Sequence, residues 1–139
     1  MSCVFCRIVR GEIPAQIIAR DESATAFLDV TPLADGHVLV VPHRHAARLD
    51  DLAEAEAEEL FRTVVRLSGV VRDAVGADGS TVGINNGEAT GQTVPHVHVH
   101  IVPRRHDDEA GSIHSIFPSG ARRDVAEIGE LIRAALEAG

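Results

Sequence analysis

The chain has 139 residues, of which 45% are hydrophobic, and a formal net charge of −8 at pH 7. This length fits one domain with a buried core, and the hydrophobic content is ordinary for a globular protein. The negative charge argues against a broad surface for nucleic acid or anionic membranes, while it leaves room for a single nucleotide in a local pocket. The sequence shows no signal peptide and no membrane-spanning apolar run, so we expect a cytoplasmic protein.

The N-terminal part predicts a short helical hook followed by three strands. Residues 3–11 form the hook, which carries both cysteines of the chain, Cys3 and Cys6. Residues 15–19 and 24–29 predict a β-hairpin around a polar turn, and residues 37–42 predict a strand buried on both faces. In a reducing compartment a Cys-x-x-Cys pair is more often redox-active or metal-binding than a structural disulfide.

The remainder predicts a long helix and a histidine-rich strand. Residues 51–75 carry an apolar residue at every third or fourth position, which is typical of an amphipathic helix. A strand over 80–85, a loop over 86–93 and a strand over 95–103 follow. Residues 104–120 are polar and irregular, and a last helix begins near residue 122. The pattern predicts a single α+β domain over residues 1–139, with an antiparallel sheet and helices on one face.

The histidine-rich strand contains His96, His98 and His100 in alternation with valine. Successive side chains of a strand point to opposite faces, so the three imidazoles share one face. Such a row suits metals, phosphates and proton transfer. Three interpretations stay open from the residues alone: a metal site with a position for water, nucleophilic catalysis by one imidazole, or solvent-facing histidines on an edge strand.

Further candidates lie before this strand. The loop offers amide and hydroxyl groups and flexible backbone that suit phosphate oxygens, but it is also compatible with an ordinary turn; these residues are Asn85, Gly87, Gly91, Gln92 and Thr93. His37 and Asp29 are either structural residues or members of a phosphate and ribose site. Their spacing in the sequence places neither of them beside the three histidines.

The run His96-Val97-His98-Val99-His100-Ile101-Val102 resembles the His-φ-His-φ-His-φ-φ signature of the histidine-triad (HIT) family of nucleotide hydrolases and transferases. The resemblance covers residues 3–103 and includes Cys3-x-x-Cys6, Gly11–Pro14, Ala26–Asp29, Gly36–Pro42 and Asn85–Thr93, whereas residues 104–139 match no pattern. It implies a five-stranded antiparallel sheet with one long helix and a C-terminal helix. It also implies a homodimer that joins two sheets edge to edge, acting on an adenosine 5′-phosphoryl substrate.

The resemblance also implies a role for each matching residue. His98 would attack the α-phosphorus and form a covalent nucleotidyl-histidine, and His100 would contact the phosphate and hold the His98 ring. His96 and His37 would complete the catalytic set. The substrate would be bound by Asp29 at the ribose, by Phe27, and by Asn85, Gly91, Gln92 and Thr93 at the phosphate or leaving group. No magnesium-binding carboxylate cluster adjoins the motif, so no catalytic metal is required.

The chain resembles two branches of the family that act on different substrates. The Cys-x-x-Cys and Ala26–Asp29 stretches resemble the Hint branch, which cleaves nucleoside phosphoramidates, while Gly91–Val94 and the following motif resemble the Fhit branch, which cleaves dinucleoside polyphosphates. We favour an AMP phosphoramidase over a dinucleoside polyphosphate hydrolase. An alternative of another class is a nucleotide-binding sensor with negligible turnover.

A structural zinc ion is a further expectation. The two-residue gap between Cys3 and Cys6 suits two thiolates on one tetrahedral ion, and His45 follows the strand over 37–42. Some bacterial HIT proteins bind zinc through this cysteine pair, a histidine at the position of His45 and the first triad histidine. By that resemblance His96 is the fourth ligand, and His43 is the main alternative to His45. Without zinc, the cysteines would be a reduced pair of thiols.

Overall fold

The structure is a computed structural model that describes residues 3–139. The chain forms two compact units, Met1–Asp108 and Glu109–Gly139. The assignment of the whole chain to one domain stays a prediction. Among the described residues, no helix combines the length and the apolar character needed to cross a membrane.

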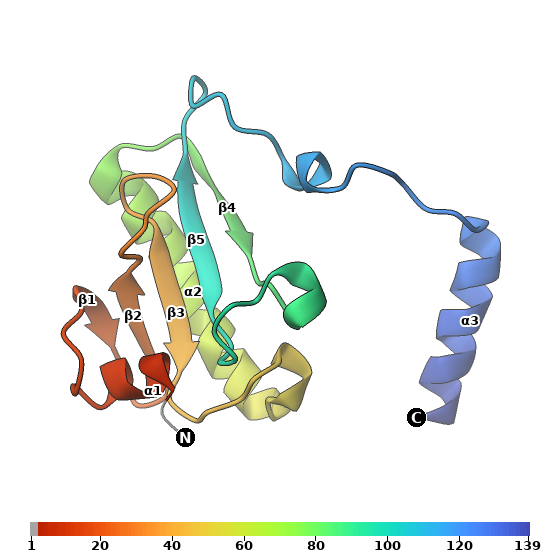
Figure 1. The fold of residues 1–139 in the computed structure, drawn as a ribbon, viewed down its shortest axis with the longest axis horizontal. Coiled ribbons are helices and arrows are strands. Elements are labelled where there is room, and N and C mark those ends of the chain that lie inside the picture. Colours follow the sequence, from red (N-terminus) through yellow and green to blue (C-terminus); the bar gives the residue numbers. More distant parts are fainter. Residues whose placement is uncertain (1–2) are drawn as a thin grey trace. The chain divides into compact units, whose positions relative to one another are not determined.

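A five-stranded antiparallel sheet forms the centre of the first unit (Figure 1). Its strands are β1 (Ile17–Arg20), β2 (Ala24–Leu28), β3 (Val38–Pro42), β4 (Gly79–Gly83) and β5 (Val99–Arg104), in the order β1-β2-β3-β5-β4. The predicted α+β class and antiparallel sheet are confirmed. Every residue of β3 is buried, as the sequence predicted, because β3 pairs with β2 and β5 and is covered on both faces.

Helix α2 (Glu54–Val75) covers one face of the sheet. Its buried residues pack against alternate residues of β2, β3 and β5; the helix contributes Leu60, Val64, Leu67 and Val71 to this core. The helix begins later than predicted, because Leu49–Asp51 form a separate 3-10 turn and the Ala53 N–H donates to Glu56 Oε1 at 2.8 Å. It ends at Gly76, whose φ of 64° is left-handed and favours glycine.

The opposite face of the sheet is covered at β2 and β3 by the hook, which contains helix α1 (Val4–Val9). Phe5 and Ile8 of α1 pack with Phe27, Leu39 and Val41 from β2 and β3. The expectation that helices lie on one face only is therefore wrong. The reason is local: β2 and β3 are apolar at consecutive positions, so both of their faces require cover.

Strand β5 begins later than the predicted strand over 95–103. Pro95 has no N–H to donate, and the Val97 N–H donates to the Ala46 carbonyl beyond the end of β3 at 2.8 Å. The ladder with β3 therefore starts at Val99, which pairs with Val40. His96 consequently lies in a bend, where its N–H donates to the Val94 carbonyl at 2.8 Å, His98 lies just before β5, and His100 lies within β5.

The second unit contains the 3-10 turn Ile113–Ile116 and helix α3 (Val125–Ala138). The Asp124 side chain accepts from the Ala126 N–H at 3.0 Å and so fixes the start of α3 three residues after the predicted position. Several large apolar side chains of the second unit are exposed; they are Ile113, Ile116, Phe117, Val125, Leu131, Ile132 and Leu136.

Candidate active site and cysteine–histidine cluster

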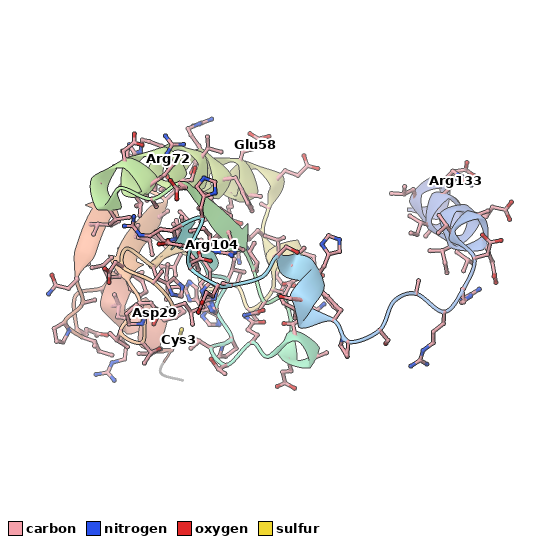
Figure 2. All side chains as sticks on the ribbon, turned by 90° about the horizontal axis from the view of Figure 1, so that it is seen from above. Cys3, Asp29, Glu58, Arg72, Arg104 and Arg133 are labelled. Atoms are coloured by element: carbon pink, nitrogen blue, oxygen red, sulfur yellow. The ribbon has the colours of Figure 1, made fainter. Side chains whose placement is uncertain are left out.

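The three triad histidines lie on the face of the sheet opposite α2. Val97, Val99 and Ile101 pack into the α2 core, which leaves the alternate positions for the histidines, as the spacing predicted. Figure 2 shows the labelled Cys3 and Asp29 on this side of the sheet, away from α2. The ring centroids of His98 and His100 are 5.0 Å apart.

A backbone amide fixes the proton positions on His37 and His100. The Leu33 N–H donates to His37 Nδ1 at 3.1 Å, so the proton of a neutral His37 ring resides on Nε2. His37 Nε2 lies 2.9 Å from His100 Nδ1, to which it donates. His100 therefore carries its proton on Nε2, and this buried atom has no partner among the described residues. A donor is thus held ready for an oxygen atom of a ligand.

His98 presents the complementary group. Its Nδ1 donates to the His96 carbonyl at 2.7 Å, which leaves the lone pair of Nε2 unprotonated in the neutral ring. The Phe5 ring lies edge-on to His98 with a centroid distance of 5.0 Å. A nucleophilic nitrogen on His98 and a donor on His100 are therefore neighbours on one surface. The role of Phe5 was not predicted from the sequence, in which its position between the two cysteines was the only signal.

The electrostatics favour neutral rings. Burial, together with the neighbouring His98 and His37 rings, lowers the pKa of His100 to about 4. Burial also lowers the pKa of His37, although the Asp29 carboxylate opposes this shift. Asp29 Oδ2 lies 3.6 Å from His37 Nε2. At neutral pH both rings are uncharged, which agrees with the proton positions set by Leu33.

The predicted metal ligands Cys3, Cys6, His45 and His96 come together, and their ligand atoms all lie within 4.8 Å of one another. His96 Nε2 donates to the Pro42 carbonyl at 2.9 Å, so its Nδ1 is free to face Cys3 Sγ at 3.4 Å and Cys6 Sγ at 3.5 Å. Two thiols and two imidazoles are a donor set that fits tetrahedral zinc, and the Pro42 carbonyl holds the required tautomer.

His45 supplies the remaining nitrogen of this cluster. Its Nδ1 lies 3.4 Å from Cys6 Sγ. His43, the alternative ligand, instead places Nε2 2.8 Å from the hydroxyl of the buried Thr25. The geometry therefore selects His45.

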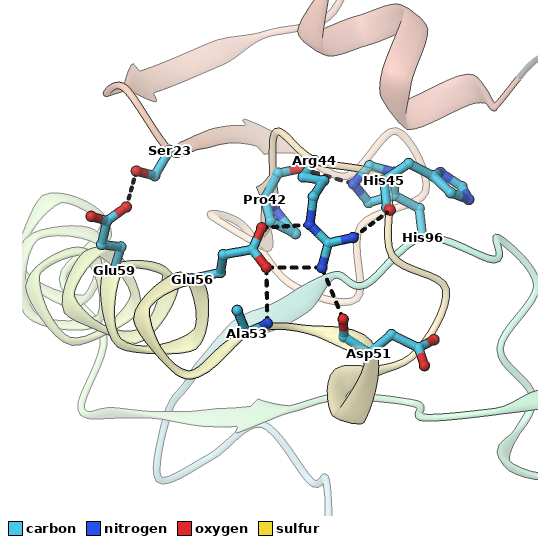
Figure 3. A network of polar contacts seen from close by, with 9 residues as sticks. All are labelled: Ser23, Pro42, Arg44, His45, Asp51, Ala53, Glu56, Glu59 and His96. Atoms are coloured by element: carbon cyan, nitrogen blue, oxygen red, sulfur yellow. Dashed lines mark hydrogen bonds and ion pairs between the residues drawn. The ribbon is translucent and has the colours of Figure 1, made fainter.

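An ion pair that the sequence did not reveal fixes the backbone at His45 (Figure 3). Arg44 donates from Nε to Glu56 Oε2 at 2.6 Å and from Nη2 to Glu56 Oε1 and to the Asp51 carbonyl, both at 2.8 Å. This arginine, together with the Ala53 N–H, lowers the pKa of Glu56 to about 2. The start of α2 thereby holds the segment that carries His45.

The loop before β5 is braced by Gln92. Its Nε2 donates to the Ala47 carbonyl at 2.8 Å and to the Val94 carbonyl at 3.0 Å, and its Oε1 accepts from the Gly87 N–H at 2.7 Å. Both N–H groups of this amide are already used, so a direct bond from Gln92 to phosphate would require one of them to be released. Gly91 has a φ of 90°, which explains a glycine there.

The other candidates divide between the loop and an apolar surface. Asn85 and Thr93 are exposed on the loop and keep polar groups available. Phe27 is 3% exposed and packs against the Phe5 ring at 5.5 Å, so the two rings form an apolar platform beside His98. Asp29 Oδ1 accepts from the Thr31 N–H at 2.9 Å, which fixes the carboxylate near His37.

Comparison with known proteins decides the family. The HIT domain model matches residues 10–107. The chain belongs to the HIT family. It is 38% identical over 108 residues to the adenosine 5′-monophosphoramidase of Schizosaccharomyces pombe, covering 78% of each chain. It is also 42% identical over 96 residues to the bis(5′-nucleosyl)-tetraphosphatase (asymmetrical) of the same yeast, covering 69% of this chain and 53% of that protein.

A solved HIT structure bears on the cysteine–histidine cluster. A zinc-bound histidine triad family protein from Mycobacterium smegmatis matches with a TM-score of 0.76 and 38% identity, covering 99% of this chain and 95% of that chain. This relative binds zinc, and the four donor atoms of the present HIT protein form a set that fits zinc. The family assignment and the HIT fold expected from the sequence are confirmed.

Proposed function

We propose that this HIT protein hydrolyses adenosine 5′-phosphoryl compounds through a nucleotidyl-histidine intermediate, with AMP phosphoramidates as the preferred substrates. The observation that carries the proposal is the pairing of an unprotonated His98 Nε2 with the protonated His100 Nε2, which has no partner among residues 3–139. One group is a nucleophile and the other a donor for a phosphoryl oxygen, and phosphoryl transfer needs both.

The first step forms the intermediate. The His98 Nε2 lone pair attacks the α-phosphorus, an N–P bond forms, and the bond from phosphorus to the amine nitrogen breaks as the amine leaves with a proton taken up from solvent. The His98 ring becomes cationic, and its Nδ1–H strengthens the hydrogen bond to the His96 carbonyl. His100 Nε2–H donates to a phosphoryl oxygen and stabilises the charge that gathers there.

The second step regenerates the enzyme. A water molecule attacks phosphorus and releases a proton to solvent, the bond between phosphorus and His98 Nε2 breaks, and AMP leaves with the oxygen of that water. Uncharged rings at His37 and His100 suit this cycle, because a neutral His100 can accept from His37 at Nδ1 and then carries its single proton on Nε2.

The remaining candidates bind or position the substrate. Asp29 accepts from ribose hydroxyls, and Phe27 with Phe5 supports the purine base. Asn85, Gly91 and Thr93 face the phosphate or the leaving group. Gln92 acts by fixing the loop. His96, whose Nε2 donates to the Pro42 carbonyl and whose Nδ1 faces the two cysteines, acts through its carbonyl.

A structural zinc ion at Cys3, Cys6, His45 and His96 belongs to the same proposal. The ion would join the hook to the segment that leads into β5 and leave no coordination position for water. The donor distances and the zinc-bound relative support it. Elemental analysis of protein purified without chelator should find about one zinc per chain, and its absence would leave the cysteines as free thiols.

We also propose a homodimer. Strand β4 is an edge strand with an exposed Val82, and α2 exposes Phe61 and Val65, so an open edge and apolar side chains are available to a second copy. Light scattering should give twice the chain mass at micromolar concentration, and a monomer mass would contradict the proposal.

The deciding experiment measures kcat/KM for an AMP–amine conjugate and for a diadenosine polyphosphate side by side. A preference for the conjugate supports the phosphoramidase. A preference for the polyphosphate moves the protein to the second candidate, dinucleoside polyphosphate hydrolysis, which the tetraphosphatase relative favours. Tight AMP binding with negligible turnover of both compounds would support a nucleotide sensor.

A further inference from the structure

His45 is the exposed member of the cysteine–histidine cluster. Cys3 and Cys6 are partly buried, and His96 is fully buried, with its ring held by the Pro42 carbonyl. The His45 ring lies edge-on to His96 at a centroid distance of 5.1 Å, and its Nε2 has no hydrogen-bond partner in the part of the chain that the structure describes. A histidine ligand normally donates this second N–H to a neighbouring group, which fixes its ring. The position of His45 therefore depends on the backbone that carries it.

The Arg44 guanidinium links this backbone to the start of α2 (Figure 3). Its Nη1 lies 3.5 Å from the His45 carbonyl, and its Nη2 donates to the Asp51 carbonyl. Its Nε and Nη2 donate to the two oxygens of the Glu56 carboxylate. Glu56 Oε1 also accepts from the Ala53 N–H, so one carboxylate both closes the start of the helix and anchors the arginine. The planar fork of arginine suits this set of acceptors, which the ammonium group of a lysine does not match.

The ion pair between Arg44 and Glu56 is poorly placed to stabilise the whole fold. The two side chains are 53% and 30% exposed. Exposed pairs contribute little to the free energy of unfolding, because water screens their charges and ordering two long side chains costs entropy. The effect of the pair is local: it fixes the segment between β3 and α2, and His45 is the residue of that segment that belongs to the cluster.

We propose that Arg44 and Glu56 are positioning residues of the metal site, which hold His45 in place for zinc and thereby set the zinc affinity. The inference rests on the proposed zinc site and adds two residues that do not touch the ion. Coupling between two sites is reciprocal. Zinc should therefore hold the Arg44–Glu56 pair, and with it the start of α2, by the same factor that the pair contributes to zinc affinity.

The first test measures the zinc dissociation constant by competition with a chromophoric chelator. Arg44→Lys keeps the charge but loses the fork, and it should weaken zinc binding by roughly 10- to 100-fold, as is usual for groups that orient a metal ligand. The Tm of the metal-free protein should change little, because the pair is exposed. Arg72→Lys, which alters a similarly exposed pair with Asp73 at the other end of α2, is the matched control and should keep the wild-type affinity.

A cycle of variants shows whether Arg44 acts through His45. His45→Ala removes the ligand itself and leaves three. In this background Arg44→Lys should cause no further loss of zinc affinity, because the residue that it positions is gone. Additive losses would mean that Arg44 acts on another part of the protein and would overturn the proposal, as would an unchanged affinity in Arg44→Lys alone.

Hydrogen exchange at the Ala53 N–H tests the reciprocal effect. Zinc should slow this exchange in the wild type by a factor similar to the loss of affinity in Arg44→Lys, and the variant should lose most of the slowing. The Ala126 N–H, which donates to Asp124 Oδ1 at the start of α3, is the matched control and should exchange at one rate with and without zinc. Equal exchange at Ala53 with and without zinc would contradict the coupling.

The outcomes separate this inference from the zinc proposal on which it rests. Wild-type protein that binds no zinc would refute both. Zinc binding that is insensitive to Arg44→Lys would overturn the positioning role alone and leave the four ligands in place.

Discussion

The two faces of the sheet are built from the same strands and do different work. In β3, Val38 and Val40 pack under α2, while Leu39 and Val41 pack under α1. The face under α2 is continuous and apolar, and a 22-residue helix covers it. Within residues 3–108, the other face has the six residues of α1 as its helical cover, and the histidines and the cysteines lie on this side.

This difference explains how a small protein keeps a reactive surface without losing its fold. Burial of apolar area under α2 supplies the stability, and the opposite face is left free for polar groups whose burial is costly. Neighbouring residues on β5 belong to different faces, so substitutions one position apart should separate activity from stability.

The largest expected effect falls on the polar face. His98→Ala should reduce kcat by about 10,000-fold, because it removes the nucleophile. The circular dichroism spectrum should remain that of a folded protein, because the side chain lies outside the α2 core. Quenching wild-type protein and substrate in base should trap an adenylylated chain, which the variant should not form. Turnover above a few per cent of wild type would contradict the covalent route.

Removal of the metal comes next. Zinc bound a thousandfold above its Kd stabilises a fold by about 4 kcal/mol, so chelation or Cys3→Ser should lower Tm by several degrees. Single-turnover rates at 10 °C below the new Tm should change much less, because no proposed step passes through the ion. Equal Tm values with and without zinc would show that the cluster is not structural.

A substitution on the α2 face should reverse this pattern. Leu60 is 1% exposed, and Leu60→Ala should lower the free energy of unfolding by about 2–5 kcal/mol through the cavity it creates. The kcat of the folded molecules should stay at the wild-type value. Urea titrations measure the free energy of unfolding, and separate activity assays on folded protein in buffer measure kcat. Val70→Ala, at a 56% exposed position of the same helix, is the control and should change neither.

The histidines should make stability depend on pH. Burial lowers the pKa of His100 from 6.5 to about 4. At a pH between 6.5 and about 4, the unfolded chain therefore binds a proton at this residue that the folded chain does not. Stability should therefore be unaffected by this group above pH 6.5 and fall by roughly 1.4 kcal/mol per unit as the pH drops toward 4. Urea titrations at pH 7 and pH 5 measure the loss, and His100→Asn should reduce it.

The smallest expected effect concerns the loop. Gln92→Leu removes the three hydrogen bonds that tie the loop to Ala47, Val94 and Gly87, and KM should rise about tenfold, or 1.4 kcal/mol, with little change in kcat. Gln92→Glu keeps the acceptor for the Gly87 N–H, so its KM should lie between those of the wild type and Gln92→Leu. A fall in kcat with an unchanged KM would instead favour contact with the reacting phosphate.

The sequence predicted which side chains lie on each face of the sheet to a large extent. Alternation of histidine and valine placed the triad opposite the α2 core, because side-chain direction in an extended chain depends only on parity. The ligand set Cys3, Cys6, His45 and His96 followed from the family resemblance, and the geometry selected His45 over His43. Such patterns are local or recognisable as motifs.

The contacts that were not predicted join distant residues or use the main chain. Arg44 and Glu56 pair across twelve positions, and neither has a neighbour in the sequence that indicates the other. The use of the Gln92 amide inside the loop depends on the Ala47 carbonyl, which every residue type would offer equally. The late start of β5 depends on where the Val97 N–H finds its acceptor.

The bond from the Leu33 N–H to His37 has a consequence for sequence variation. A main-chain N–H donates at every pH and in every residue type except proline, so it gives the whole His37–His100 chain one direction. The Leu33 side chain itself is 78% exposed and takes no part. Position 33 should therefore accept many side chains and exclude one residue, proline, which an inspection of side-chain chemistry alone would not reveal.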